Sequence, residues 1–182
     1  MRLLSPTAAL STLSLSELEE AGGELTRRIA VALRSLGESG ADRLTPSEKS
    51  SDSEPRRCTA RLAALLELTA TALAAAVGTA PENSRGGIYP RAQTKALETS
   101  VMYAAPTIDA LLTRLEQDRR LLVSLARAVE SQLAERHPTP LGMIKLRTLV
   151  TEMAITEPAR TAQALERALA AQRNAKHAAT ET

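Results

Sequence analysis

Hydrophobic positions repeat with helical spacing along most of the chain. Residues 14–36 carry one apolar stripe, the pattern of a helix that buries a single face. The stripe consists of Leu18, Leu25, Ile29, Leu33 and Leu36. Ser14 and Glu17 have the spacing of a capping box, and Gly37 follows as a helix stop. The Gly22-Gly23 pair predicts either a bend or a close helix contact, because each glycine costs about 1 kcal/mol relative to Ala.

Three more helices are predicted in the middle of the chain, over residues 56–77, 91–104 and 106–136. The last is the longest, at about 30 residues, and Pro106 fits its first turn. Its apolar seam has heptad-like spacing, which is typical of a bundle or a coiled coil. The positions seven residues apart are Ile108, Leu115, Leu122 and Val129.

The C-terminal part predicts two helices joined by a turn, an αα-hairpin over residues 141–175. The first helix, 140–155, has two apolar faces, as expected of a helix that is buried centrally or lies at an interface. Thr156-Glu157-Pro158 is expected to start the second. The stretch superficially resembles a bacterial helix-turn-helix, but Arg160 occupies a usual aliphatic position and Leu165 comes one residue late.

These patterns predict an all-α protein built around one helical bundle, residues 58–177. Residues 1–36 form an N-terminal helix that docks on this bundle or on a neighbouring subunit. Residues 37–57 read as a flexible linker with one large aliphatic side chain, Leu44, and residues 178–182 as a disordered tail.

Composition supports helices and narrows the classes of ligand. The 182 residues include no Phe, no Trp and two Tyr, whereas 33 Ala and 28 Leu favour helix. The scarcity of aromatic rings argues against aromatic-lined small-molecule pockets and extensive base stacking. We therefore expect no small-molecule substrate and no cofactor.

The formal net charge is +2, unevenly distributed, with −3 over residues 1–55 and +5 over residues 56–182. Of the 23 basic residues 19 are Arg, the side chain best suited to bidentate contacts with phosphate or carboxylate. A GC-rich coding sequence would produce the same Arg and Ala bias without selection for function. Both interpretations of the arginines stay open.

Catalytic and targeting signals are sparse. Cys58 is the only cysteine, and His137 and His177 fall in an inter-helix turn and in the tail, so no metal-ligand spacing or catalytic triad is predicted. No phosphate-binding glycine loop occurs. The N-terminus makes a poor secretory signal, and no apolar run approaches the ~18 residues of a membrane span. The sequence predicts a cytoplasmic, non-enzymatic protein without membrane or metal.

Three groups of residues are candidates for contact with nucleic acid. They lie in the Arg-Gly-Gly loop and the residues that follow it, on the outer face of helix 106–136, and on one face of the last helix. In that order they are Arg85, Tyr89, Arg91 and Lys95; Arg120 and Arg127; and Arg160, Gln163 and Arg167. Each group has an ordinary structural alternative: a tight turn, a charge-compensated helix face in which Glu116 and Glu130 pair with the arginines, and an αα-hairpin.

Two functions follow as alternatives. The first is a non-catalytic accessory subunit of a nucleoprotein assembly that contacts the nucleic-acid backbone through arginine, and its fold-level analogues are phage packaging subunits and small subunits of RNA-guided effectors. The second is a protein–protein scaffold, adaptor or virion component without a nucleic-acid role. Excess apolar surface predicts self-association or protein partners. The candidate interface residues are Leu18, Leu25, Ile29, Leu33, Leu141, Ile144, Leu165 and Leu169.

Overall fold

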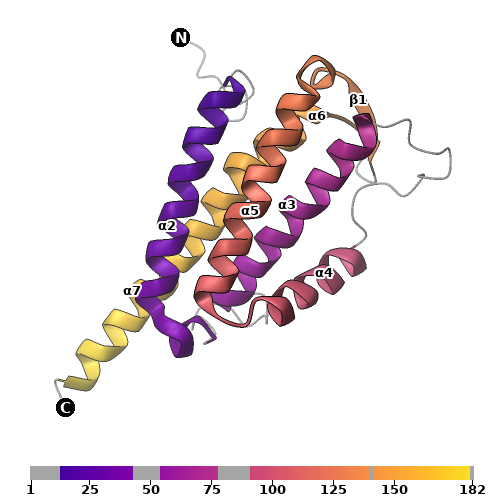
Figure 1. The fold of residues 1–182 in the computed structure, drawn as a ribbon. Coiled ribbons are helices and arrows are strands. Elements are labelled where there is room, and N and C mark those ends of the chain that lie inside the picture. Colours follow the sequence, from indigo (N-terminus) through magenta and orange to yellow (C-terminus); the bar gives the residue numbers. More distant parts are fainter. Residues whose placement is uncertain (1–12, 43–53, 78–90, 140–141, 181–182) are drawn as a thin grey trace, which may run out of the picture.

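The computed structural model describes residues 13–42, 54–139 without 78–90, and 142–180, and it confirms the all-α class (Figure 1). The helices α2, α5 and α3 lie side by side, α7 passes behind them, and the short α4 crosses the lower end of α3. The elements are α2 (Leu15–Ala41), α3 (Pro55–Val77), α4 (Arg91–Ala104), α5 (Ile108–Ala128), η2 (Glu130–Gln132), β1 (Arg136–Thr139), β2 (Gly142–Lys145), α6 (Leu146–Thr151), η3 (Glu152–Thr156) and α7 (Glu157–Thr180).

The start of α2 is the predicted capping box. The backbone N–H of Glu17 donates to the Ser14 hydroxyl at 3.2 Å, and the Ser14 N–H donates to the Glu17 carboxylate at 2.6 Å. At the other end Gly37 has φ +68°, a conformation that favours glycine, and the chain turns there before one more helical turn to Ala41. The predicted linker 37–57 is therefore helical at both ends, and its middle lies outside the described residues.

The N-terminal helix docks on its own chain. Leu18, Ile29 and Leu33 are fully buried in the common core. The guanidinium of Arg28 also donates three hydrogen bonds of 2.8–3.0 Å to Glu166 on α7.

Helix α5 is shorter than the predicted 106–136. Its first residue is Ile108, and Thr107 is the N-cap, because the Thr107 hydroxyl accepts the Ala110 N–H at 3.2 Å. Pro106 therefore lies before the helix and not in its first turn. It ends at Ala128, and a 3₁₀ turn follows. Leu133 is buried all the same, since the tighter turn still directs it into the core. The seam was read correctly, but a buried side chain does not require the helix to continue.

The predicted helix 140–155 is wrong in its first half. Residues 136–139 and 142–145 form an antiparallel hairpin, and helix begins only at Leu146. Pro138 and Pro140 lack the N–H that a helix would need, and Gly142 disfavours helix. This hairpin pairs Arg136 directly with Lys145.

The predicted αα-hairpin is also wrong, because α6, η3 and α7 form one continuous helical run from Leu146 to Thr180. Pro158 removes the N–H that would bond to Ala154, and the chain passes this position through a π-helical segment instead of a turn. The helix also continues to Thr180, within the segment expected to be a tail. Figure 1 shows α7 projecting beyond the bundle at its C-terminal end.

The Gly22-Gly23 pair marks a close helix contact. A Cβ on Gly22 would lie 2.9 Å from the carbonyl oxygen of Ala154, the oxygen that Pro158 cannot satisfy. The missing side chain lets α2 approach the π-helical segment backbone to backbone. The close-contact alternative for this pair is thus correct at Gly22.

Arg56 joins three helix ends in the lower part of the bundle. Its nearly buried guanidinium donates to Asp42 and Glu38 of α2 and, at 2.6 Å, to the carbonyl of Pro106 just before α5. Glu38 in turn accepts the Ile108 N–H at 2.9 Å, which together with Arg56 lowers the pKa of this carboxyl. One side chain thereby fixes the C-terminus of α2 and the N-termini of α3 and α5.

Candidate functional site

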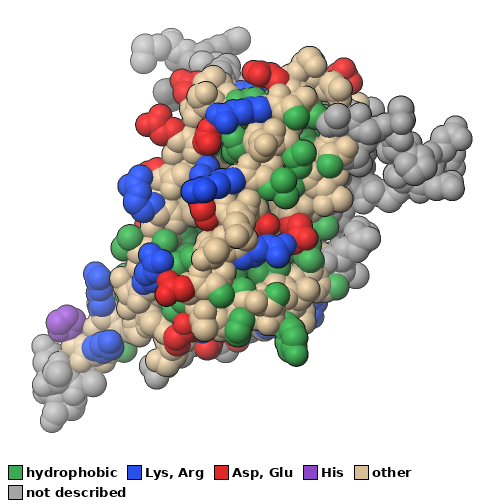
Figure 2. All heavy atoms as spheres, in the orientation of Figure 1, with side chains coloured by type: hydrophobic (Ala, Val, Ile, Leu, Met, Phe, Trp, Pro, Cys, Tyr) green, Lys and Arg blue, Asp and Glu red, His purple; other side chains and the backbone are tan. Residues whose placement is uncertain are grey.

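A groove of about 550 Å³ runs between α2 and α5 on the face shown in Figure 2. The two helices are antiparallel here, because Arg34 pairs with Asp109 at one end and Arg127 with Glu19 at the other. The lining is Gly23, Thr26, Arg27, Ala30 and Arg34 from α2 and Leu112, Thr113, Glu116, Gln117, Arg119 and Arg120 from α5. The groove combines a floor of small and apolar groups with a rim of guanidinium groups.

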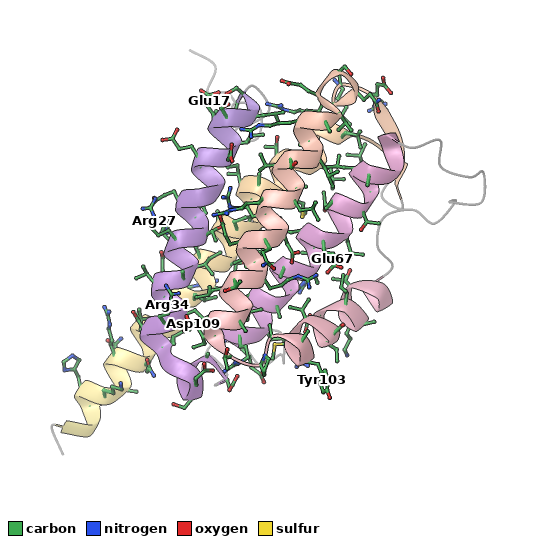
Figure 3. The ribbon with its side chains drawn as sticks, in the orientation of Figure 1. Glu17, Arg27, Arg34, Glu67, Tyr103 and Asp109 are labelled. Atoms are coloured by element: carbon green, nitrogen blue, oxygen red, sulfur yellow. The ribbon has the colours of Figure 1, made fainter. Side chains whose placement is uncertain are left out.

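The rim arginines are only partly neutralised. Arg27 and Arg34 are 69% and 62% exposed and each has one carboxylate partner, Glu24 and Asp109 respectively, the second at 3.0 Å. Figure 3 shows both arginines projecting from α2, with Asp109 beside Arg34. A guanidinium has five N–H donors, so each retains donors that face solvent.

Glu116 serves two arginines at the α5 wall of the groove. Its carboxylate accepts from Arg119 at 2.8 and 2.9 Å and from Arg120 at 2.7 Å. The hydrogen bonds from Arg119, with those from Arg120, lower the pKa of Glu116 against a smaller opposing effect of burial. Arg119 also donates to the carbonyl of Glu19 at 3.3 Å and so ties α5 to α2.

The floor of the groove has free space above Gly23. The nearest atom to a Cβ built there is Cζ of Arg119, 4.0 Å away, which is ordinary contact distance. Val31 follows Arg27 by one turn on α2, and Leu121 follows Gln117 by one turn on α5. Both are large apolar side chains in solvent, 62% and 47% exposed. Neither side chain is among the lining residues of the groove.

A second ionic cluster lies on the side of α5 that faces α3. Arg114 donates to Asp118 at 2.8 and 3.0 Å and to Glu67 of α3 at 2.5 Å. Asp118 is 7% exposed, and burial raises its pKa although the Arg114 hydrogen bonds act in the opposite direction. This cluster joins α5 to α3.

Those predicted nucleic-acid residues that the structure describes lie on three different helices, α4, α5 and α7. Arg85 and Tyr89 lie outside the described residues, as does the side chain of Arg91, whereas Lys95 is exposed on α4. Arg120 pairs with Glu116, as the compensated alternative predicted. Arg127 pairs with Glu19 of α2 rather than with the expected Glu130.

The last predicted group lies on the exposed face of α7. Arg160 pairs with Glu157 and, at 3.7 Å, with Glu152, while Gln163 and Arg167 are exposed to solvent. Figure 2 shows basic and acidic side chains alternating along α2 and α5 instead of forming one basic strip. The charge pattern of this face is the one expected of the scaffold alternative.

The predicted partner interface is mostly internal. Leu18, Ile29, Leu33 and Leu165 are fully buried within this chain, and Leu25, Ile144 and Leu169 are half-buried. Leu141 lies outside the described residues. The sequence predicts excess apolar surface only when each helix is considered separately. In the structure α2 and α7 pack against each other and bury these apolar stripes.

Sequence reasoning missed Arg27, Arg34, Val31 and Leu121. A Val between two arginines on the polar side of an amphipathic helix was a usable signal, because that face is otherwise charged. Tyr103, 90% exposed and pointing away from α4, was passed over in favour of Tyr89 (Figure 3). The groove itself had no sequence signal, since it depends on how α2 and α5 pair.

Other classes of site are not found in the part of the chain that the structure describes. No group of three His, Cys, Asp or Glu side chains could hold a metal ion there. None of the described helices is long and apolar enough to pass through a bilayer. No family model, no curated protein and no solved structure matches this chain.

Proposed function

We propose that this protein is a non-catalytic helical component of a larger assembly and that it acts by binding other protein chains. The observation that carries the proposal is internal charge compensation. Ten of the 19 arginines form ion pairs with carboxylates of the same chain, and three of the candidate nucleic-acid residues are among them. The ten are Arg27, Arg28, Arg34, Arg56, Arg57, Arg114, Arg119, Arg120, Arg127 and Arg160.

Purification of the native protein with its neighbours, after mild crosslinking and nuclease treatment, tests this proposal. We expect a protein partner in constant stoichiometry that survives nuclease digestion. A matched variant, with Arg160 and Arg167 on α7 replaced by Ala, is expected to retain that partner. If the association disappears on nuclease treatment, the proposal is wrong.

Contact with nucleic acid is the second candidate, and the β1–β2 hairpin favours it. Arg136 and Lys145 face each other directly across the two strands, and no carboxylate of the described residues pairs with either. Like charges in this position destabilise a hairpin, so an anionic ligand would relieve the repulsion. The double variant R136A/K145A would then reduce the slope of log K against log salt by about 2. An unchanged slope would exclude this hairpin as the contact.

Cytoplasmic location, self-association and a link to phage or mobile elements stay predictions from the sequence. The proposal needs none of them. It requires an accessible surface that recognises protein, and the α2–α5 groove is the surface of the described residues best suited to that role.

A further inference from the structure

We infer that the α2–α5 groove binds an acidic helix of a partner protein. This inference rests on the proposed function and adds the chemistry of the partner: a helix with two carboxylates about seven residues apart on the face that bears small apolar side chains.

The groove has the length of a short helical segment. Its α2 wall extends from Gly23 to Arg34, which corresponds to about 17 Å of helix axis, or three turns. Gly23, Thr26 and Ala30 keep the floor low over this length. A partner helix could therefore place Ala or Leu against the floor at i, i+3 or i+4, and i+7.

An extended peptide does not suit this surface. The walls are two α-helices whose backbone groups bond within each helix, so they offer no free N–H or C=O row for an added strand. An extended occupant would leave its own backbone groups unpaired over an apolar floor. A helix satisfies those groups internally.

The charges specify carboxylates at discrete positions. Arg27 and Arg34 are seven residues apart on one rim, about 10 Å of helix axis, and Arg120 is 72% exposed on the other. Four arginines line the groove, and the three carboxylates that pair with them are Glu24, Asp109 and Glu116. The net excess is therefore one positive charge, and the unused N–H donors of Arg27, Arg34 and Arg120 are the groups that individual acidic side chains would contact.

A synthetic amphipathic helix of about four turns is the probe. It carries Glu at i and i+7 and Ala or Leu between them, and its matched control carries Gln in place of Glu. Amide chemical shifts of the isotope-labelled protein, at 19.4 kDa, report both the site and the affinity. We expect saturable shifts along Gly23–Arg34 and Leu112–Arg120 with the Glu peptide, and about tenfold weaker binding of the Gln peptide.

Two variants locate the contact. R27E/R34E is expected to lower the affinity of the protein for the Glu peptide by at least about tenfold. R167E/R173E, on the exposed face of α7, should change that affinity by less than about twofold. Should the charge reversals disturb folding, R27Q/R34Q replaces them. Equal binding of both peptides, no shifts in the groove, or equal losses in the two double variants would overturn the inference.

The native partner separates this inference from the proposed function. If a partner is recovered with the wild-type protein and equally well with R27E/R34E, the groove inference fails and the proposed function stands. If the wild-type protein recovers no protein partner, the proposed function itself fails. If the wild-type protein recovers the partner and R27E/R34E does not, the result supports both the proposed function and the groove inference.

Discussion

Two carboxylates on α5, two positions apart, show how different the sides of this helix are. Asp118 faces α3 and is almost fully buried, and burial raises its pKa. Glu116 faces α2 beside the groove, and hydrogen bonds from Arg119 and Arg120 lower its pKa. The same residue class on the same helix is therefore buried on the side of α3 and partly exposed on the side of the groove.

Two adjacent glycines of α2 repeat this contrast. Gly22 touches the backbone of the π-helical segment, where no Cβ fits, whereas Gly23 opens onto the groove, where a Cβ fits easily. Backbone contact closes an interface completely. Beside Gly23, by contrast, the interface between α2 and α5 stays accessible as the groove. The contrast indicates which surfaces hold the fold and which remain available to a partner.

The largest effect is expected at Gly22. Gly22→Ala should lower the free energy of unfolding by about 2 kcal/mol, because the new Cβ forces apart two backbones that cannot yield like a flexible side chain. Urea denaturation measures the change. An unchanged midpoint would mean that α2 does not approach Ala154 this closely.

Gly23→Ala is the matched control and should act in the opposite direction. It removes a helix-interior glycine without a clash, so we expect stabilisation by up to about 1 kcal/mol in the same urea experiment. Destabilisation at this position would show that the floor of the groove is closed.

Glu116 and Asp118 should change acid stability in opposite directions. The folded pKa of Glu116 lies below its ordinary 4.5, so its contribution is complete above pH 4.5 and is lost as the pH falls through the folded pKa. The folded pKa of Asp118 lies above its ordinary 3.8, so its contribution is present at low pH and is lost as the pH rises through the folded pKa.

Glu116→Gln should therefore flatten the loss of stability on acidification, and Asp118→Asn should steepen it. For Glu116 we expect a difference of at most about 1 kcal/mol, because its pairs are partly screened by solvent. Urea unfolding at several pH values from neutral to acid provides the measurement. A shift of both variants in the same direction would remove the distinction between the two sides of α5.

The smallest effects are expected on the rim of the groove. Arg27→Ala and Arg34→Ala should each change the free energy of unfolding by less than about 0.5 kcal/mol, because exposed ion pairs contribute little. Thermal unfolding of the two single variants is sufficient to check this. A larger loss of stability would show that the rim arginines stabilise the fold. The binding experiment would then use R27Q/R34Q in place of R27E/R34E.

The sequence predicted the fold class and the buried seams because these depend on periodicity alone. Ile108, Leu115, Leu122 and Val129 all lie in the core, and the capping box at Ser14 forms as expected. The seam did not predict where α5 ends, because a 3₁₀ turn buries Leu133 as well as an α-helical turn would.

The errors came from proline and from pairs of helices. Pro158 was interpreted as a break, but a π-helical segment accommodates it, and Gly22 fits against the carbonyl of Ala154. The groove could not be predicted, since Arg34 meets Asp109 only after α2 packs against α5. Local spacing predicts the ion pair between Arg120 and Glu116, which are four residues apart. It does not predict the pair between Arg127 and Glu19, because these residues lie on different helices.

The Arg56 junction bears on how far the length of the segment between Asp42 and Arg56 can be altered. Asp42 and Arg56 are directly bonded at 2.6 Å, so both ends of residues 43–53 are held by contacts that do not involve those residues. Doubling the length of a closed loop costs only about 0.6 kcal/mol in chain entropy. A tag or a reporter domain inserted there would leave the bundle intact, and the α2–α5 groove could be studied in a protein labelled at that point.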